Sequence, residues 1–108
     1  MRHGDIVSVV MQGDLGKPRP ALVIQSNHFI SEHSSVTILP VTSTIVPAPL
    51  LRITIHPTPE NGLQKPSQVM IDKAMTVKKE KIGSIFGKID AKSMIEVERS
   101  LAIFLGLG

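Results

Sequence analysis

The feature that most constrains the fold of this chain is a succession of short apolar segments separated by turn-forming residues. The segments are rich in β-branched and large apolar side chains, which favour strands, and Gly, Pro and Asn between them indicate turns such as Asn61-Gly62. Pro40 lies inside one segment and suggests a bulge or an edge strand there. The expected strands are Asp5–Met11, Pro20–Ser26, Val36–Ser43, Leu51–His56, Ser67–Val77 and Ile82–Ile89.

The C-terminal segment departs from this pattern and predicts a single amphipathic helix. Asp90 can cap a helix that starts at Ala91, because its carboxylate accepts hydrogen bonds from the unpaired N–H groups of the first turn. Gly106 is a suitable C-terminal stop. Apolar residues recur at helical spacing and form one stripe: Met94, Val97, Leu101, Ala102 and Leu105. The expected architecture is therefore mainly β, a small and strongly bent barrel with a C-terminal α-helix packed on it.

Length and composition place the chain among small globular proteins. Its 108 residues, 42% of them hydrophobic, predict one domain over residues 1–108. No apolar run approaches the roughly 20 residues that span a bilayer, and Asp5 interrupts what would be the apolar region of a secretion signal. We therefore expect a cytoplasmic protein without a membrane partner. The absence of cysteine rules out disulfides and thiolate metal sites.

The charge balance favours an anionic partner. Lys and Arg number 12 against 9 Asp and Glu, which gives a formal charge of +3. The aromatic residues are 3 Phe, too few for a platform on which several bases stack. A nucleic acid would therefore be bound mainly through charges and hydrogen bonds.

Arg19 stands between two prolines at the start of a β-forming run, in the sequence KPRPALVIQSN. Pro18 and Pro20 each fix their own φ and push the preceding residue towards extended geometry. Arg19 therefore enters the strand with little backbone freedom. Such a pattern can present a cation in a fixed place, although it can also simply begin an edge strand.

Five blocks, taken in order, resemble the MazF/PemK toxins of bacterial toxin–antitoxin modules. They read GDIVSVV, GKPRPALVIQSN, ILPVTS, NGLQKPSQVMIDKAMTV and IGSIFGKID, and the C-terminal MIEVERSLAIFLGL resembles the closing helix of that family. The similarity runs from Arg2 to Leu107, and the ordered set is much more specific than any one block. It implies an SH3-like β-barrel of the MazF/CcdB type.

The resemblance also implies an activity and partners. Members of this family are homodimers that cleave single-stranded mRNA at a short sequence without a metal or other cofactor, and so inhibit translation and growth. A cognate antitoxin blocks the active groove, and the toxin–antitoxin complex is expected to bind DNA. By residue-to-residue correspondence, Arg19 matches the catalytic arginine of the family and Thr42 its catalytic threonine.

These two residue types suit the implied chemistry. The ribose 2′-hydroxyl attacks the adjacent phosphorus and expels the 5′-oxygen, leaving a 2′,3′-cyclic phosphate and a 5′-hydroxyl. A guanidinium can hold the charge that develops on the nonbridging oxygens, and a threonine hydroxyl can donate to the same phosphate. Because a guanidinium stays protonated, Arg19 is a poor general base, and the base is left unassigned.

The residues expected to bind RNA are Lys17, Ser26, Asn27, His28, Ser43, Asp72 and Lys73. Asp72 lies in the block that supplies an acidic residue to the RNA groove of the family, but it can equally be an exposed strand carboxylate. His28 is either a candidate base near neutral pH or a solvated loop histidine. Ser26, Asn27 and Lys17 have similarly ordinary alternatives as strand-end and loop residues. The four histidines show no recognised metal spacing, so we expect no metal site.

Two departures from the family pattern keep other functions open. Met75 stands where the family usually has an arginine before its threonine, and the loop Gln12–Lys17 is shorter than is common. Both put base specificity and activity in question. The alternatives are a non-enzymatic gyrase-binding toxin like CcdB, and a degenerate binding module. The CcdB recognition end carries a tryptophan, which this chain lacks.

Overall fold

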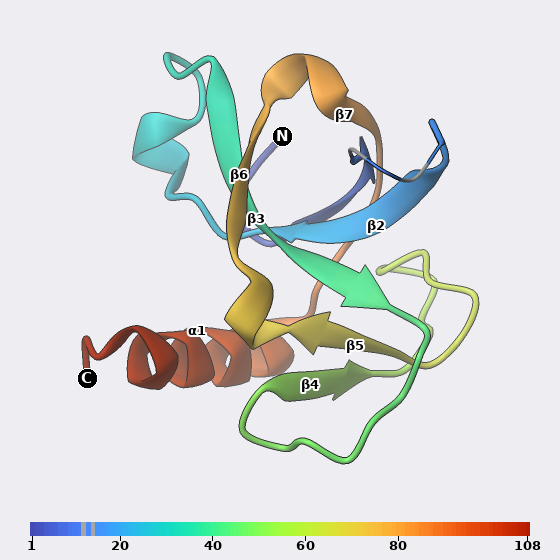
Figure 1. Ribbon diagram of the computed structural model, residues 1–108, viewed down its shortest axis with the longest axis vertical. Helices are drawn as coiled ribbons and strands as arrows, with labels where there is room; N and C mark the ends of the chain where they lie inside the picture. Colours follow the sequence, from blue (N-terminus) through green and yellow to red (C-terminus); the bar gives the residue numbers. More distant parts are fainter. Residues whose placement is uncertain (12, 14) are drawn as a thin grey trace.

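The computed structural model describes residues 1–11, 13 and 15–108, and these form a strongly bent antiparallel sheet with one helix packed against it (Figure 1). Gln12 and Asp14, in the loop expected at Gln12–Lys17, lie outside the described residues. The described strands are β1 Asp5–Val10, β2 Pro18–Val23, β3 Ser35–Thr42, β4 Arg52–Ile55, β5 Ser67–Met70, β6 Met75–Lys78 and β7 Ile82–Lys88. The prediction of a mainly β, barrel-like fold with a C-terminal helix is confirmed.

Some neighbouring strands in the sheet are consecutive in the chain and others are not. The strands lie in the order β4-β5-β3-β2-β1-β7, and β6 pairs with β3 off this path. Short 3₁₀ turns, η1 Asn27–Phe29, η2 Ile71–Lys73 and η3 Lys79–Lys81, connect the strands. In the part of the chain that the structure describes, no helix is both long and apolar enough to cross a lipid bilayer.

The prediction of one strand over Ser67–Val77 is wrong, because η2 divides this segment into β5 and β6. β5 pairs with Val41–Thr42 of β3, whereas β6 pairs with Ser35–Ile38 of the same strand. A single straight strand could not stay paired with β3 through the bend of the sheet. Ile71, fully buried in η2, anchors the turn between the two pairings.

Pro40 lies in an interior strand and not at the edge or bulge suggested by its type, because β3 is paired on both sides. In the register with β2, Ala21 faces Pro40 without a shift. On the other side of β3, pairing with β6 ends at Ile38 and pairing with β5 begins at Val41. The missing N–H of proline therefore falls between two partners, where no ladder bond is lost.

Other strand ends differ from the predictions by up to three residues. β2 begins at Pro18 and ends at Val23, where Pro20–Ser26 was expected, because Pro18 and Arg19 pair with β1 and residues 24–26 turn into η1. Smaller differences occur at Met11, Ser43, at both ends of Leu51–His56, and at Ile89. Pairing partners, which local propensity does not encode, decide where these strands end.

The bent sheet buries apolar side chains on both faces, since successive strand residues point to opposite sides. One cluster lies under the helix and contains Ile6, Leu22, Leu39, Val41, Ile53, Ile55, Val69, Ile71, Ile89, Met94 and Val97. The other contains Val7, Val9, Ala21, Val23, Ile30, Val36 and Ile38. The alternation of Ile6 with Val7, and of Leu22 with Val23, accounts for the two clusters.

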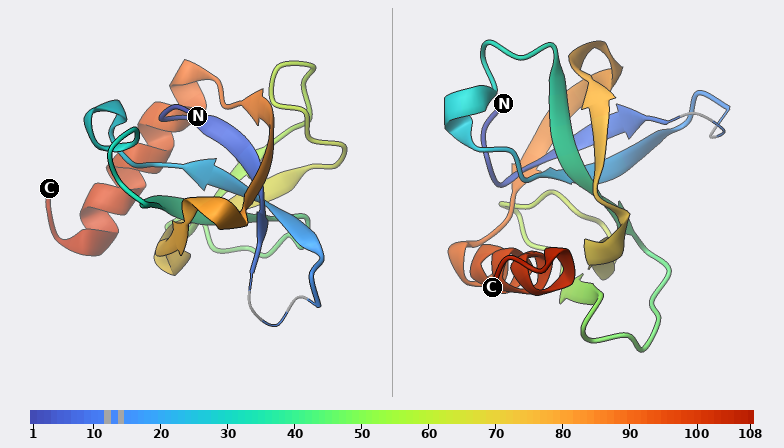
Figure 2. Two further views of the ribbon diagram at one scale, coloured as in Figure 1. Left: turned by 90° about the horizontal axis from the view of Figure 1, so that it is seen from above. Right: turned by 60° about the vertical axis from the view of Figure 1, so that its left-hand side comes forward.

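The helix α1, Ala91–Leu105, begins and ends where the sequence predicted. The Asp90 carboxylate accepts the Ser93 N–H at 2.9 Å, and Gly106 adopts a left-handed conformation with φ 75°. Figures 1 and 2 show α1 beside β4 and β5 at one end of the barrel. Leu105, the last member of the predicted apolar stripe, is 51% exposed, because the helix runs past the edge of the core in its last turn.

Candidate functional site

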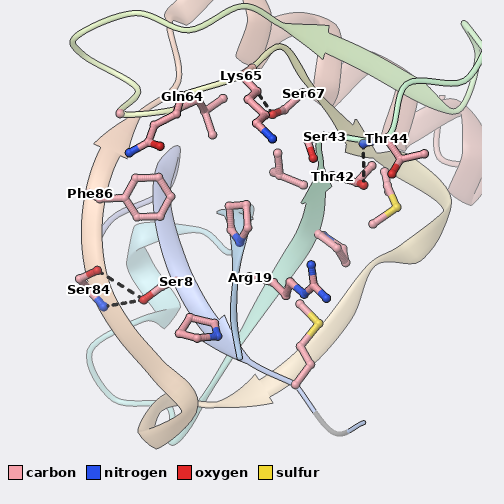
Figure 3. A pocket seen from close by; sticks show the side chains of 18 residues that line it. Ser8, Arg19, Thr42, Ser43, Thr44, Gln64, Lys65, Ser67, Ser84 and Phe86 are labelled. Carbon is pink, nitrogen blue, oxygen red and sulfur yellow. Dashed lines mark hydrogen bonds between the residues drawn. The ribbon is translucent and has the colours of Figure 1, made fainter. Parts of the chain in front are cut away.

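An open groove of about 860 Å³ runs across the barrel between β2, the end of β3, β7 and residues 62–67 (Figure 3). This volume falls within the range of sites that take up ligands. Arg19, Thr42 and Ser43 line one side of the groove, and Gln64, Lys65 and Phe86 lie along the other sides. Side chains from segments far apart in the sequence therefore meet here.

The structure brings Arg19 and Thr42 into the same groove, from neighbouring strands. The β2–β3 register ends at the pair Ala21 and Pro40, so Arg19 and Thr42 lie beyond that pair at the same end of the two strands. Both residues line the groove. Arg19 also pairs with Val9 of β1, which fixes its backbone from the other side.

The hydroxyl of Thr42 is oriented by the backbone that follows it. Its Oγ1 accepts the N–H of Thr44 at 3.1 Å. A hydroxyl has one donor and two acceptor positions, so this contact leaves the O–H of Thr42 to donate into the groove. Thr42 is half-buried, which limits the positions that its side chain can take.

The groove is electropositive in its described part. Among the described residues that line it, the charged side chains are Arg19 and Lys65, and both are exposed. Two cations facing one concave surface attract an anion along the groove. Figure 3 shows the Lys65 ammonium pointing inward from the loop that precedes β5.

A buried asparagine, Asn61, fixes the turn of residues 56–63, which leads to Lys65 at one wall of the groove. Asn61 is 3% exposed, and its Oδ1 accepts the N–H groups of Thr58 and Leu63, each at 3.0 Å. Its Nδ2 donates to the carbonyl of His56 at 2.9 Å, and Thr58 Oγ1 accepts the Asn61 N–H at 3.1 Å. These bonds tie residues 56–63 into one rigid turn that leads directly to Gln64 and Lys65.

Two glycines let this turn lie directly on β7. The backbone of Asn61 packs against Gly87 so closely that a Cβ at residue 87 would overlap it. Gly62 has φ +69° and lies against the backbone and ring of Phe86. A hydrogen bond of 2.8 Å from the Lys88 N–H to the Glu60 carbonyl joins the same two segments. The turn and β7 thus form one continuous wall.

Sequence reasoning missed Lys65, Gln64, Phe86, Ser8 and Ser84 as groove residues. The Asn61-Gly62 turn was visible in the sequence, and the block NGLQKPS was part of the family resemblance. Neither signal tells which strand the turn packs against. The contact with β7 is a tertiary one, and it places Gln64 and Lys65 in the groove beside Phe86.

The structure places several sequence-predicted site residues outside this groove. Ser26, Asn27 and His28 lie at the opposite end of β2 from Arg19, in or next to η1. Ser26 Oγ accepts the His28 N–H at 3.2 Å, and Asn27 Oδ1 accepts the His3 N–H at 2.7 Å. The first contact caps η1, and the second joins η1 to the N-terminal segment. His28 is exposed and does not line the groove.

Lys17, Asp72 and Lys73 lie next to groove residues without lining the groove themselves. Lys17 is exposed and immediately precedes Pro18, which lines it. Asp72 and Lys73 form part of η2, two and three residues after the groove residue Met70, and their side chains approach to 3.8 Å. Their predicted roles in RNA binding stay predictions. Met75, in place of the family arginine, is paired with Ile38 in β6.

The described residues contain no group of three or more His, Asp or Glu side chains arranged to hold a metal ion. His3 Nε2 lies 3.3 Å from Glu98 Oε1, and the ring of His33 packs against that of Phe29. These two histidines therefore belong to local contacts on the surface, away from the groove.

Comparison with known proteins settles the family. The family model of PemK-like, MazF-like toxins of type II toxin–antitoxin systems matches residues 2–105. The chain belongs to this family. The resemblance seen in the five sequence blocks is thereby confirmed.

Relatives of this MazF-like chain agree with that assignment. A curated protein of Mycolicibacterium smegmatis, a probable endoribonuclease MazF, is 43% identical over 108 residues, which cover 99% of this chain and 98% of the relative. A MazE–MazF crystal structure from Deinococcus radiodurans matches with a TM-score of 0.83 and 22% identity, covering 100% of this chain and 97% of the other. The Mycobacterium tuberculosis toxin MazF-mt6 matches with a TM-score of 0.82 and 21% identity, covering 96% and 98%. The two structures share the fold of this chain.

Proposed function

We propose that this MazF-like chain is the endoribonuclease toxin of a type II toxin–antitoxin module, and that it cuts single-stranded mRNA at a short sequence. The observation that carries the proposal is the meeting of Arg19 and Thr42 in one electropositive groove. The probable endoribonuclease MazF of M. smegmatis, 43% identical over nearly the whole chain, supports the same activity.

In the proposed reaction the chain acts on a phosphate that lies between Arg19 and Thr42. The ribose 2′-hydroxyl attacks the phosphorus, the bond to the 5′-oxygen breaks, and the products carry a 2′,3′-cyclic phosphate and a 5′-hydroxyl. The Arg19 guanidinium donates to the nonbridging oxygens as negative charge builds on them. The O–H of Thr42, held by the Thr44 contact, donates to the same phosphate.

The proposed partners are a second copy of the chain and a cognate antitoxin. α1 exposes Ile95, Ile103 and Phe104, with Leu107 just beyond its end, and exposed apolar side chains grouped on one element favour burial in an interface. An acidic antitoxin segment would suit the electropositive groove and compete with RNA for it. The expected place of action is the cytoplasm, where mRNA is found.

The test is incubation of the purified protein with a long single-stranded RNA in the presence of a chelator. Wild type, Arg19→Ala and the control Arg99→Ala, which removes an exposed arginine on α1, would be compared and all fragment ends mapped. We expect discrete cuts with 2′,3′-cyclic phosphate ends from wild type and Arg99→Ala, and none from Arg19→Ala. Intact RNA from a folded protein that still arrests growth would overturn the proposal and make gyrase the next target.

A further inference from the structure

Phe86 occupies an irregular position in β7 that turns its side chain into the groove. β1 pairs Ile6 with Gly87 and Val7 with Ile85, so Phe86 has no partner on β1 and forms a bulge. Bulges commonly re-aim a side chain beside a functional site. Figure 3 shows the ring on the side of the groove that faces Arg19 and Thr42.

The ring of Phe86 is supported from below but remains open to the groove. A Cβ at residue 62 would lie 2.9 Å from its Cδ2, so the ring rests against the backbone of Gly62. Phe86 nevertheless stays 37% exposed, and it lines the groove. A rigidly seated ring with an open face is the arrangement on which a nucleobase stacks.

Polar side chains line the groove together with this ring. Figure 3 shows the Gln64 amide above the ring, Lys65 further along the same loop, and Ser8 with Ser84 below. The Ser8 hydroxyl is fixed because it accepts the Ser84 N–H at 2.8 Å within a second irregularity of the β1–β7 pairing. An amide presents both donors and an acceptor, so Gln64 can discriminate between base edges.

We infer that Phe86, Gln64 and Lys65 form a nucleotide subsite, in which one base of the RNA stacks on Phe86, Gln64 reads its edge, and Lys65 contacts an adjacent phosphate. The inference rests on the proposed ribonuclease function and adds specificity to it. Phe86 and Gln64 are specificity-determining residues across the groove from Arg19, so the base they bind flanks the phosphate that is cut.

The first experiment measures binding to a short RNA that contains the mapped cut site, with a 2′-deoxy nucleotide at that site so that it is not cleaved. Phe86→Leu keeps an apolar side chain without a stacking face, Phe86→Tyr keeps the ring, and Phe29→Leu is a matched change at an exposed phenylalanine in η1, outside the groove. We expect Phe86→Leu to weaken binding about 5- to 100-fold, with Phe86→Tyr and Phe29→Leu within about twofold of wild type.

The second experiment locates the stacked base. Abasic nucleotides are introduced one position at a time, and each RNA is bound to wild type and to Phe86→Leu. At one position the abasic change should weaken binding to wild type but add nothing to the loss in Phe86→Leu, and Gln64→Ala should relax base preference at that position only. The subsite would be overturned if Phe86→Leu bound RNA normally, or if every abasic change weakened binding to Phe86→Leu as much as binding to wild type. In either case, cleavage of RNA by wild type would leave the proposed function standing. Failure of wild type to cleave RNA would instead overturn the proposed function.

Discussion

The substitution Asn61→Ala tests whether one buried amide holds the wall that carries Gln64 and Lys65. The change removes the acceptor of the Thr58 and Leu63 N–H groups and the donor to the His56 carbonyl. Each hydrogen bond contributes about 0.5–1.5 kcal/mol net, and more where the remaining partner stays buried and unpaired. Loss of all three is therefore expected to lower the free energy of unfolding by about 2–4 kcal/mol.

Thermal and denaturant unfolding, followed by circular dichroism, measure this loss. A decrease of about 2–4 kcal/mol in a domain of this size corresponds to a fall in Tm of at least about 8 °C. Asn27→Ala is the matched control, because it removes one hydrogen bond from an exposed asparagine and should cost less than about 1 kcal/mol. The mutant should also lose RNA affinity while keeping its cut position, since Arg19 and Thr42 lie on other strands. If Asn61→Ala unfolded like Asn27→Ala, the turn would not depend on this amide.

Three further predictions test the groove and the helix. Thr42→Val keeps the side-chain shape but removes the donor, and should lower kcat about 10²–10³-fold. It also removes the acceptor of the Thr44 N–H, so the free energy of unfolding should fall by about 0.5–1.5 kcal/mol. A rate near wild type would exclude the proposed role of the hydroxyl. The hydrogen bond from the Ser93 N–H lowers the pKa of Asp90 in the folded protein below its value in the unfolded chain. The cap therefore stabilises the fold fully at pH values above the unfolded pKa. This stabilisation is lost as the pH falls through the lower, folded pKa. Asp90→Ala should therefore cost about 0.5–2 kcal/mol at pH 7 and much less in strong acid, and an equal cost in both conditions would contradict the cap. Lys65→Ala should reduce the slope of log K against log salt for RNA binding by about 0.7, whereas Lys92→Ala, on the helix, should leave the slope unchanged.

Local sequence signals predicted the elements whose ends are set by their own residues. Asp90 and Gly106 act on the backbone next to them, and the helix boundaries follow from that chemistry alone. The β-branched and apolar segments likewise predicted where most of the strands form. The break at η2 was not predicted, because it depends on β3 changing partners, and the exposure of Leu105 depends on where the barrel ends.

The residues of the candidate site also fall into those that the sequence predicted and those that only tertiary contacts bring into the groove. Arg19 and Thr42 were named from intact family blocks, and they line one groove from the same end of two neighbouring strands. Lys65 and Phe86 were missed because they meet only when the turn 56–63 packs on β7, a contact between segments that no local pattern connects. His28 was placed near the site on the basis of its position after a strand, but that strand carries Arg19 at its other end.

The close packing of the turn on β7 divides the positions of this wall into two groups. At Gly62 and Gly87 a larger side chain does not fit, whereas Gln64 and Phe86 point their side chains into the groove. Any side chain at Gly87, or a bulkier residue at Gly62, would drive the two segments apart, so mutation cannot vary these positions without losing the wall. Gln64 and Phe86 line the groove, and Phe86 also packs against Gly62. In the proposed subsite, an exchange at Gln64 would change the preferred base while Gly62 and Gly87 keep the turn on β7.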